Sequence, residues 1–494
     1  MIYLIAKKNS NQGRLIMVKN ATEIKEIIEK NKLSEDNSIY ALFNALSVQS
    51  IFSRQASKIK RTDVGHEAMS IMILFLVLPV FLAKSVNSYY KSFYGKSSEM
   101  KKDTLYRFMN NEKMCWRSLL LSIGVAFIKK TRNSKDISSP SVFVLDDTTL
   151  EKRGSLIEGV SLVYDHTKNK CVEGYKLLTL GYYDGLSFIP LDNSFHSEKP
   201  LSIKKRKKQH QKERSSKSSG FKRKKELLKT KIASALEMIK RATKRKISAD
   251  YIAFDSWFFG ENFIKEILKI GEKSGVKINV ACAVKSSINF VSNGKSNNSG
   301  ELRAIASKNH NGKRCRSFKN CIYYQFDVEY KKIPLRLFVS RLPGQKKWHS
   351  FISTDKSLSF VEFMKIYSIR WGIEVFFKES KQLLGLGKCQ SNTFDAQIAS
   401  AARAFILYTV LSYYKRSRVT ETIGGLFCEV SDNIKEMSLA EKIFCSIFCK
   451  SEKLKDACLQ YFLETNPEKR KDFFAKLFSL VFFDVFSQSD AITL

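Results

Sequence analysis

Residues 141–149, SVFVLDDTT, place four apolar side chains directly before two adjacent aspartates and two threonines. The run Val142-Phe143-Val144-Leu145 is typical of a β-strand that is buried on both faces of an α/β sheet. A second short run of this kind, Tyr251-Ile252-Ala253-Phe254, also leads into an aspartate, Asp255. Because ligand sites of α/β sheets gather at the ends of such strands, we expect these acids to lie at one edge of a sheet.

Further elements around these two strands complete an α/β pattern. The strand candidates Tyr175–Tyr183 and Leu186–Phe195 flank Asp184-Gly185, a strong signal for the tight turn of a β-hairpin. A helix is predicted over Glu226–Lys240 and another strand over Val276–Val284. The order of strand, hairpin, helix, strand, helix and strand predicts a mixed α/β sheet with helices on its faces.

The remaining chain shows different patterns, and we expect five parts. The first is helical, with apolar periodicity in four runs: Ala21–Lys32, Ser38–Ile51, Asp63–Ser85 and Lys102–Lys130. A β-rich insertion with alternating aromatic residues interrupts the α/β pattern. The expected divisions are 1–137 (helical), 138–284 (core, first part), 285–351 (β-rich insertion), 352–395 (core, second part) and 396–494 (helical).

The charge of the chain indicates a polyanionic partner. It has 85 Lys and Arg against 48 Asp and Glu, a formal net charge of +37. Such an excess destabilises the compact state by self-repulsion, and nucleic acid is the partner that best explains it. Twelve of the basic residues lie in segment 204–225, which has a single Glu. Because like charges repel, we expect this segment to be an extended, solvent-exposed loop that is able to contact phosphates.

Several classes of protein are disfavoured by the sequence. The apolar stretch Ala68–Ala83 is shorter than the roughly 20 residues that span a bilayer, and Pro79 interrupts it, so we expect a buried helix and no membrane association. The first eight residues are too short an apolar stretch for a secretory signal. The ten cysteines include no CxxC pair, which disfavours zinc and disulfides and fits a cytoplasmic location.

One helix carries an unusual set of polar residues. A long helix is predicted over Ser359–Leu383, where Ser359 and Glu362 form a capping box. Within it Tyr367, Arg370, Glu374 and Lys381 follow one another at intervals of 3, 4 and 7 residues. At about 100° per residue, all four fall within a sector of roughly 60° on one helix face. A solvated polar stripe, with Arg370 and Glu374 as an ordinary i,i+4 pair, is the alternative interpretation.

The acids at the strand ends and on this helix would suit divalent metal ions. Taken singly, an Asp after a strand is as often a turn residue or a helix N-cap. Carboxylates that converge would repel one another unless a cation lay between them, and hard oxygen ligands select Mg²⁺ or Mn²⁺. Two such ions about 4 Å apart serve phosphoryl transfer, one at the attacking oxygen and one at the leaving oxygen.

The sequence of residues 367–381, YSIRWGIEVFFKESK, resembles a known signature. DDE transposases of bacterial insertion sequences, in the insertion-sequence-four group, carry Y-x2-R-x3-E-x6-K on the helix of the catalytic glutamate, and all four positions match here. The group's first aspartate precedes a Thr pair, which favours Asp147, although the adjacent Asp146 leaves the choice open by one residue. The resemblance covers roughly residues 138–412.

This resemblance implies a fold and a set of metal ligands. The expected catalytic core is ribonuclease-H-like, with the β-rich insertion between the second aspartate and the glutamate. Its ligands for two Mg²⁺ (or Mn²⁺) ions would be Asp147, Asp255 and Glu374.

The resemblance also implies a DNA-binding set. Tyr367, Arg370 and Lys381 are expected to hold the phosphates of a transposon end, which agrees with the chemistry of a hydroxyl and two cations. Trp348 resembles the insertion-domain tryptophan associated with stacking on a flipped base near the cut. A core-packing role for Trp348 is an equally good interpretation.

The expected function is therefore that of a DNA transposase. It would cleave strands at the transposon ends with metal-activated water and transfer the freed 3′-hydroxyl into target DNA, either directly or through a hairpin. By the same resemblance, residues 1–137 would bind the terminal inverted repeats and residues 396–494 would support a homodimer, in the bacterial cytoplasm on nucleoid DNA. The alternatives are a catalytically inactive or domesticated DNA-binding regulator and a nuclease of the same fold that only hydrolyses DNA.

Overall fold

The computed structural model describes most of the chain between residues 39 and 432. The described residues are 39–59, 65–83, 85–92, 95, 98, 100–132, 139–154, 156–309, 311–318, 320–416 and 422–432. The chain divides into two compact units, and residues 42–92 with 98–429 form one of them. This unit contains all of the described strands. The predicted helix Ala21–Lys32 and residues 433–494 of the predicted helical C-terminal region lie outside the described residues.

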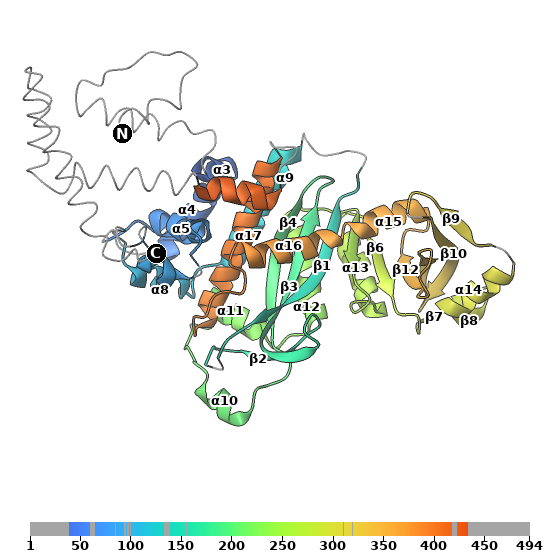
Figure 1. Cartoon of the computed structure of the whole chain (residues 1–494), viewed down its shortest axis with the longest axis horizontal. Coiled ribbons are helices and arrows are strands. Elements are labelled where there is room, and N and C mark those ends of the chain that lie inside the picture. The colour runs from blue at the N-terminus through green and yellow to red at the C-terminus, as the bar shows by residue number, and fades with distance from the viewer. Residues whose placement is uncertain are drawn as a thin grey trace, which may run out of the picture. The chain divides into compact units, whose positions relative to one another are not determined.

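A mixed sheet is the centre of this unit (Figure 1). Its strands are ordered β2-β3-β1-β5-β6-β12-β11-β10-β7-β8, while β4 pairs with β3 and β9 with β10. The expectation of an α/β fold with a mixed sheet is confirmed. The strands are β1 (Val142–Glu151), β2 (Ser161–Asp165), β3 (Lys170–Tyr183), β4 (Phe188–His196), β5 (Tyr251–Phe254), β6 (Asn279–Val284), β7 (Asn289–Ser292), β8 (Lys295–Asn298), β9 (Lys313–Cys315), β10 (Cys321–Tyr330), β11 (Ile333–Arg341) and β12 (His349–Ser353).

Strand β1 is longer than the sequence indicates. It pairs in parallel with β5 only as far as Leu145, which lies opposite Phe254. Its antiparallel pairing with β3 continues to Glu151. Asp146 and Asp147 therefore lie inside β1, at the point where its parallel neighbour ends, and not after the end of the strand.

The hairpin predicted at Asp184-Gly185 is confirmed between β3 and β4. Gly185 has a φ of +102°, which a residue without a Cβ adopts at little cost. The carboxylate of Asp184 accepts hydrogen bonds from the backbone N–H groups of Leu186 (3.2 Å) and Ser187 (2.9 Å). This side chain therefore stabilises the turn that the dipeptide predicts.

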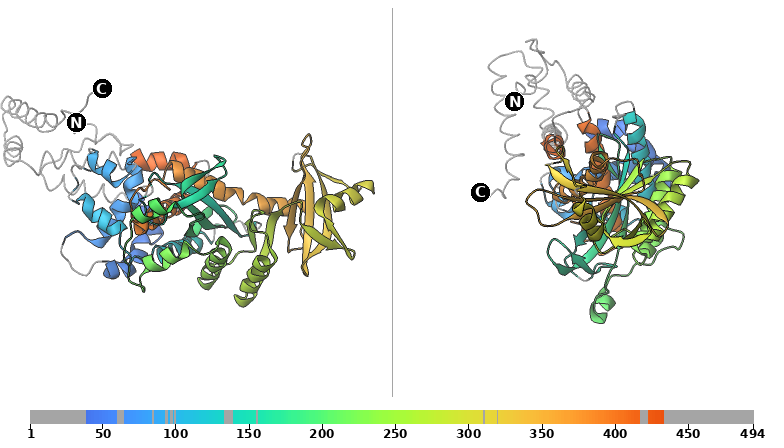
Figure 2. Two further views of the ribbon diagram at one scale, coloured as in Figure 1. Left: turned by 90° about the horizontal axis from the view of Figure 1, so that it is seen from below. Right: turned by 90° about the vertical axis from the view of Figure 1, so that its right-hand side faces the viewer.

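Helices cover both faces of the sheet. Helix α16 (Trp371–Gln382) packs against β1, β4 and α17 (Phe394–Lys415), whereas α12 (Lys231–Lys244) packs against β3, β4 and α13 (Glu261–Lys273). Consecutive residues of a strand point to opposite faces, and Asp146 contacts α16 while Asp147 contacts α12. Figure 2 shows the two sets of helices on either side of the sheet. The adjacent aspartates thus belong to different faces.

The long helix predicted over Ser359–Leu383 is divided in two. Helix α15 (Phe360–Ser368) begins with the predicted capping box, in which Ser359 and Glu362 each accept a hydrogen bond from the other's backbone N–H. It ends before α16, where the backbone N–H of Arg370 donates to Tyr367 and that of Gly372 to Ile369. These i→i−3 bonds form a tighter turn than an α-helix and separate Tyr367 from Arg370 and Glu374.

The predicted β-rich insertion is part of the same sheet. Strand β12 pairs antiparallel with β6, so that Ser350 lies opposite Val284, and β11 and β10 follow outward. Residues 292–299 contain most of the β7–β8 hairpin, and helix α14 (Ser299–Lys308) follows it. Strand β12 was not predicted, and it crosses the boundary that we expected after residue 351.

Apart from residues 39–41 and 95, the described helical residues before residue 137 belong to the same compact unit as the sheet. The run Lys102–Lys130 is interrupted at residues 110–115, and α9 packs against both β4 and α17. The boundary expected at residue 137 therefore does not separate two compact units. The helices are α3 (Ile39–Ala45), α4 (Val48–Ile59), α5 (Ala68–Val77), η3 (Leu78–Phe81), α6 (Val86–Lys91), α8 (Lys102–Met109) and α9 (Trp116–Thr131).

Helix α5 and the 3₁₀ turn η3 correspond to the apolar stretch at residues 68–83. Phe75, Leu76 and Leu78 are buried, as expected of a core helix. In the part of the chain that the structure describes, we find no helix with the length and apolar character needed to cross a membrane.

Segment 204–225 is more ordered than its charge predicts. It contains α10 (Ile203–Lys208) and most of α11 (Ser219–Glu226), joined by a stretch whose Arg214 is 3% exposed. The prediction of an extended loop is wrong here because buried carboxylates from elsewhere in the unit neutralise several of the cations.

Candidate active site

Asp146 and Asp255 lie at the edge of the sheet where β5 ends. Leu145 and Phe254 are paired in the parallel register, so the residues that follow them are neighbours on the same face. Burial, with smaller contributions from the carboxylates of Asp255 and Asp147, raises the pKa of Asp146 to about 7 against the opposing effects of the Asp147 N–H and the Arg370 guanidinium. Burial above all thus makes an uncompensated negative charge on Asp146 unfavourable.

Arg370 links Asp146 to the glutamate of α16. Its Nη1 donates to Oδ2 of Asp146 at 3.1 Å, and its Nη2 donates to Oε1 of Glu374 at 2.6 Å. The side chain of Arg370 is 18% exposed, and those of Asp146 and Glu374 are 19% and 34% exposed. One guanidinium therefore joins two carboxylates that are far apart in sequence, and the i,i+4 pair of the alternative interpretation is part of a larger cluster.

Asp147 has different partners on the other face of the sheet. Its Oδ2 accepts a hydrogen bond from Nζ of Lys231 at 2.6 Å, and its Oδ1 lies 3.7 Å from Nζ of Lys176. Lys231 also lies over the ring of Trp257, 4.5 Å from the centroid. The structure thus brings Asp146, and not Asp147, together with Arg370 and Glu374. The assignment of Asp147 as a metal ligand stays a prediction, and the alternative left open at Asp146 agrees better with this geometry.

Tyr367 and Lys381 lie on either side of this cluster. The Arg370 guanidinium is 5.8 Å from the ring centroid of Tyr367, and burial raises the pKa of the Tyr367 hydroxyl to about 12. Lys381 donates from Nζ to Oγ1 of Thr148 at 2.7 Å, which places it on the Asp146 face of β1. Burial lowers the pKa of Lys381, while Asp165 opposes this effect. The four signature positions therefore lie along one face of the sheet despite the break in the helix.

Trp348 lies in the insertion and is enclosed by cations. The guanidinium groups of Arg303 and Arg341 are 4.9 and 4.7 Å from its ring centroid, and Tyr324 packs against it. This environment favours the packing interpretation of Trp348 over a free stacking surface. Sequence reasoning missed two tryptophans that are exposed, unlike Trp348, and that closely follow Asp255 and Arg370 in the sequence: Trp257 (52% exposed) and Trp371 (62% exposed).

The chemistry of the acids on this face fits hard divalent cations. Asp146, Asp255 and Glu374 offer carboxylate oxygens only, the donor type that Mg²⁺ and Mn²⁺ prefer. Among the described residues, no three acid, His or Cys side chains stand close enough together to hold a metal ion as they lie. Arg370 instead supplies the positive charge between two of these acids.

Comparison with known families gives two overlapping matches. A family model described as "DDE superfamily endonuclease" matches residues 82–281, and one described as "Transposase DDE domain" matches residues 229–410. A comparison with curated proteins found no match. The two models together span β1, β5 and α16, the elements that carry Asp146, Asp255 and Glu374. These matches support a DDE transposase, an enzyme of the transposase and endonuclease kind whose substrate is DNA.

Proposed function

We propose that this chain is a transposase of the insertion-sequence-four group, which cleaves DNA at transposon ends and joins the freed 3′-ends to target DNA. The observation that carries the proposal is the convergence of Asp146, Arg370 and Glu374 at the edge where Asp255 follows β5. The transposase and endonuclease family matches over the same elements support it.

We propose Asp146, Asp255 and Glu374 as the residues that hold two Mg²⁺ or Mn²⁺ ions, the metals that enzymes of this superfamily generally use. When bound, the ions would activate the attacking oxygen and stabilise the leaving oxygen of the scissile phosphate. Before they bind, the chain itself balances the acids, because Arg370 pairs with Asp146 and Glu374. Asp146, Asp255 and Glu374 are each partly buried, which strengthens their electrostatic effect relative to fully solvated carboxylates.

Three cationic or hydroxyl groups beside the acids would orient the DNA backbone. Arg370 and Lys381 supply positive charge, and the Tyr367 hydroxyl, which is protonated at neutral pH, is able to donate to a phosphate oxygen. Lys381 now donates to Thr148, and this bond is one that a phosphate oxygen would replace. These contacts position the strand without reading its sequence.

The strands β4-β3-β1-β5-β6, with α12, α13, α16 and α17 on their faces, form the part that we propose as the ribonuclease-H-like core. Support comes from the antiparallel strands β4, β3 and β1, which lie beside β5 and β6, two strands parallel to β1. Asp146 and Asp255 directly follow Leu145 and Phe254, the last pair of the parallel β1–β5 ladder. Binding of the inverted repeats by residues 1–137, a homodimer through residues 396–494 and action on nucleoid DNA in the cytoplasm remain proposals from the resemblance alone.

The test is a cleavage assay with the Glu374→Gln variant. A duplex carrying the two DNA flanks of the coding region would be incubated with Mg²⁺ and scored for strand breaks at the element ends and for joined products. Wild type should give both, and the variant should bind the duplex with unchanged affinity but leave it intact. Cleavage by the variant would show that Glu374 is not one of the metal ligands.

The same assay separates the alternatives. Breaks without joined products would indicate a nuclease that only hydrolyses DNA. Specific binding of the ends by wild type without breaks, in Mg²⁺ and in Mn²⁺, would indicate a DNA-binding regulator.

A further inference from the structure

We name segment 203–226 the basic arm. Nine of its twelve basic residues fall into two sets with different surroundings. One set is paired with acids and largely buried: Lys212, Arg214, Arg223 and Lys224. The other set is exposed on α10: Lys204, Lys205, Arg206, Lys207 and Lys208. A charge run that only served solubility would not need the first set.

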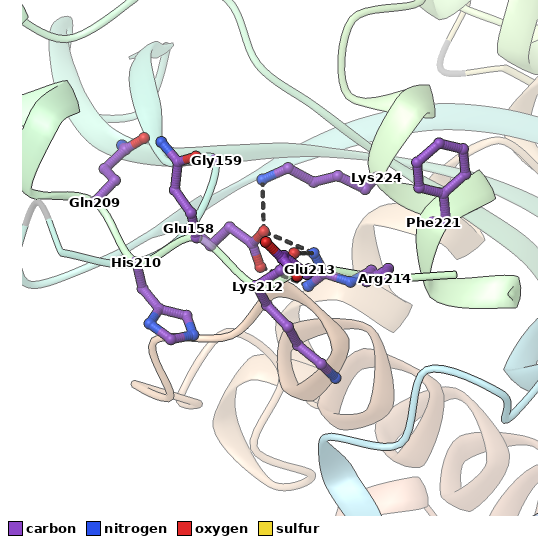
Figure 3. Close-up of a pocket in the computed structure, with 10 residues that line it drawn as sticks. Glu158, Gly159, Gln209, His210, Lys212, Glu213, Arg214, Phe221 and Lys224 are labelled. Atoms are coloured by element: carbon purple, nitrogen blue, oxygen red, sulfur yellow. Dashed lines mark hydrogen bonds and ion pairs between the residues drawn. The ribbon is translucent and has the colours of Figure 1, made fainter. Parts of the chain in front are cut away.

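The paired set forms a clasp at the base of the basic arm. Arg214 donates from Nη1 and Nη2 to the two carboxylate oxygens of Glu158, at 2.7 and 2.6 Å, and from Nε to Asp395 at 3.0 Å. Lys212 donates to the same oxygen of Asp395 at 2.8 Å, and Nζ of Lys224 lies 3.3 Å from Glu158. Figure 3 shows Arg214 and Lys224 beside Glu158, at the wall of a pocket of about 600 Å³. We define the clasp as Glu158, Asp395, Lys212, Arg214 and Lys224.

The clasp is buried enough to hold the basic arm in one place. The side chains of Arg214, Glu158 and Asp395 are 3%, 5% and 3% exposed. Removing one partner would leave a buried charge without compensation, which is strongly unfavourable. Glu158 lies in the loop after β1 and Asp395 in the first turn of α17, so the clasp joins the basic arm to two separate parts of the core.

Two further bonds fix the end of α10. The side chain of Gln209 donates to the carbonyl of Val160 at 2.7 Å, and the backbone N–H of His210 donates to the carbonyl of Leu156 at 2.8 Å. The helix itself has no buried residue, and Figure 1 shows it projecting from the side of the sheet that carries β2. Only Lys205 among its cations has an acidic partner in the described residues, Glu173 at 2.5 Å.

We propose that α10 is a duplex-DNA-binding element that the clasp presents rigidly to the phosphate backbone, away from the acid cluster. The proposal rests on the proposed function for its choice of partner. The cations lie on a helix that is anchored at its end. This arrangement suits a partner with fixed, regularly spaced negative charges better than mobile counterions. Since five consecutive residues spread around the helix axis, two or three of them face one DNA backbone at a time.

The first experiment measures the salt dependence of DNA binding. The quadruple variant Lys204→Gln, Arg206→Gln, Lys207→Gln and Lys208→Gln removes four exposed charges of α10 and keeps the Lys205 pair. A matched control removes four exposed charges on and just after α13, as Lys265→Gln, Lys269→Gln, Lys273→Gln and Lys277→Gln. Fluorescence anisotropy of a labelled generic duplex, in EDTA and from 50 to 300 mM KCl, gives the slope of log K against log salt.

Each phosphate contact adds about 0.9 to the magnitude of this slope, so the α10 variant should lower it by about 2 to 3. The α13 control should lower it by less than about 1. Equal slopes for the two variants would overturn the proposal. A second result would also overturn it: wild type binds vesicles of anionic lipid, the α10 variant does not, and the DNA-binding slope of the α10 variant equals that of wild type.

The second experiment tests the rigid presentation. Arg214→Gln keeps every charge of α10 but opens the clasp, so hydrogen exchange in residues 203–226 should accelerate and DNA affinity at 150 mM KCl should fall several-fold. The α10 variant should leave this exchange unchanged. Unaltered exchange and affinity in Arg214→Gln would contradict the clasp. None of these measurements involves strand cleavage. A result that contradicts DNA binding by α10 is therefore distinguishable from one that contradicts the proposed function, which the Glu374→Gln assay tests.

Discussion

The two neighbouring aspartates of β1 show how one residue step changes a role. Asp146 meets Arg370 at 3.1 Å on the face of α16, and Asp147 meets Lys231 at 2.6 Å on the face of α12. A strand turns alternate side chains to opposite faces, so the two acids cannot both contribute to the same cluster. Asp147 instead anchors Lys231, which lies over the exposed ring of Trp257.

A matched pair of substitutions tests this division. Asp146→Asn should reduce strand cleavage by a thousandfold or more, because it removes a proposed metal ligand and leaves Arg370 with one partner. Asp147→Asn should retain cleavage within about tenfold and lower stability by about 1–3 kcal/mol, since Lys231 loses a charged partner. Initial rates of nicking in Mg²⁺ and urea unfolding measure the two effects. The reverse order of the two nicking rates would reinstate Asp147 as the ligand.

At the scale of the element, α16 is fixed by an aromatic cluster. Phe376 is fully buried, and its ring centroid lies 5.8 Å from that of Phe188 on β4, 5.0 Å from Phe405 and 4.8 Å from Tyr408 on α17. The position of Glu374 therefore depends on packing two residues away from it. Packing of the apolar face of α16 in the core thus fixes the orientation of its polar face.

The cost of loosening this helix can be measured with two substitutions on it. Phe376→Ala should destabilise the protein by about 3–5 kcal/mol, because it opens a cavity between α16, β4 and α17. Trp371→Ala, at a side chain that is 62% exposed, should change stability by about 0.5 kcal/mol or less. Urea unfolding of both variants provides the comparison, and similar losses would contradict the role of the aromatic cluster.

The elements also show where sequence patterns are informative. The apolar runs predict β5 at its observed bounds, and Asp184-Gly185 predicts its hairpin, because both signals are local. The length of β1 and the existence of β12 depend on partners distant in sequence, β3 and β6. The junction between α15 and α16 reads Ser368-Ile369-Arg370 and contains no proline. Periodicity alone therefore predicts one continuous helix.

The candidate site was predictable to a similar degree. The signature spacing predicts that Tyr367, Arg370, Glu374 and Lys381 act together, and the structure gathers them on one face. The face that each aspartate of the doublet occupies depends on the register of β1 with β5, which no local pattern specifies. The clasp was missed for the same reason, since Glu158 and Asp395 are separated from Arg214 by long stretches of chain.

For the whole molecule, the clasp predicts how stability depends on pH. The Arg214 ion pair and other hydrogen bonds, opposed by burial, lower the pKa of Glu158 from 4.5 to about 2. The folded state therefore binds this proton more weakly than the unfolded state. The stabilisation is fully present above pH 4.5 and is lost as the pH falls towards 2.

The variant Glu158→Gln should remove this dependence. Its loss of stability relative to wild type should be greater at pH 7 than at pH 2.5 by up to about 3 kcal/mol, the equivalent of the shift in pKa. Glu213→Gln is the control, because Glu213 is exposed on the same segment. Urea unfolding at the two pH values measures the difference, and an equal loss at both would contradict the lowered pKa.

The pairing of β6 with β12 has a consequence for the ancestry of the fold. Val284 and Ser350 are opposite one another in the ladder, so the chain leaves β6 and returns in β12 at neighbouring Cα positions about 5 Å apart. A tight two-residue turn would close that gap. We therefore expect that residues 285–349 can be replaced by a shorter or longer segment without displacing Asp255 or Glu374.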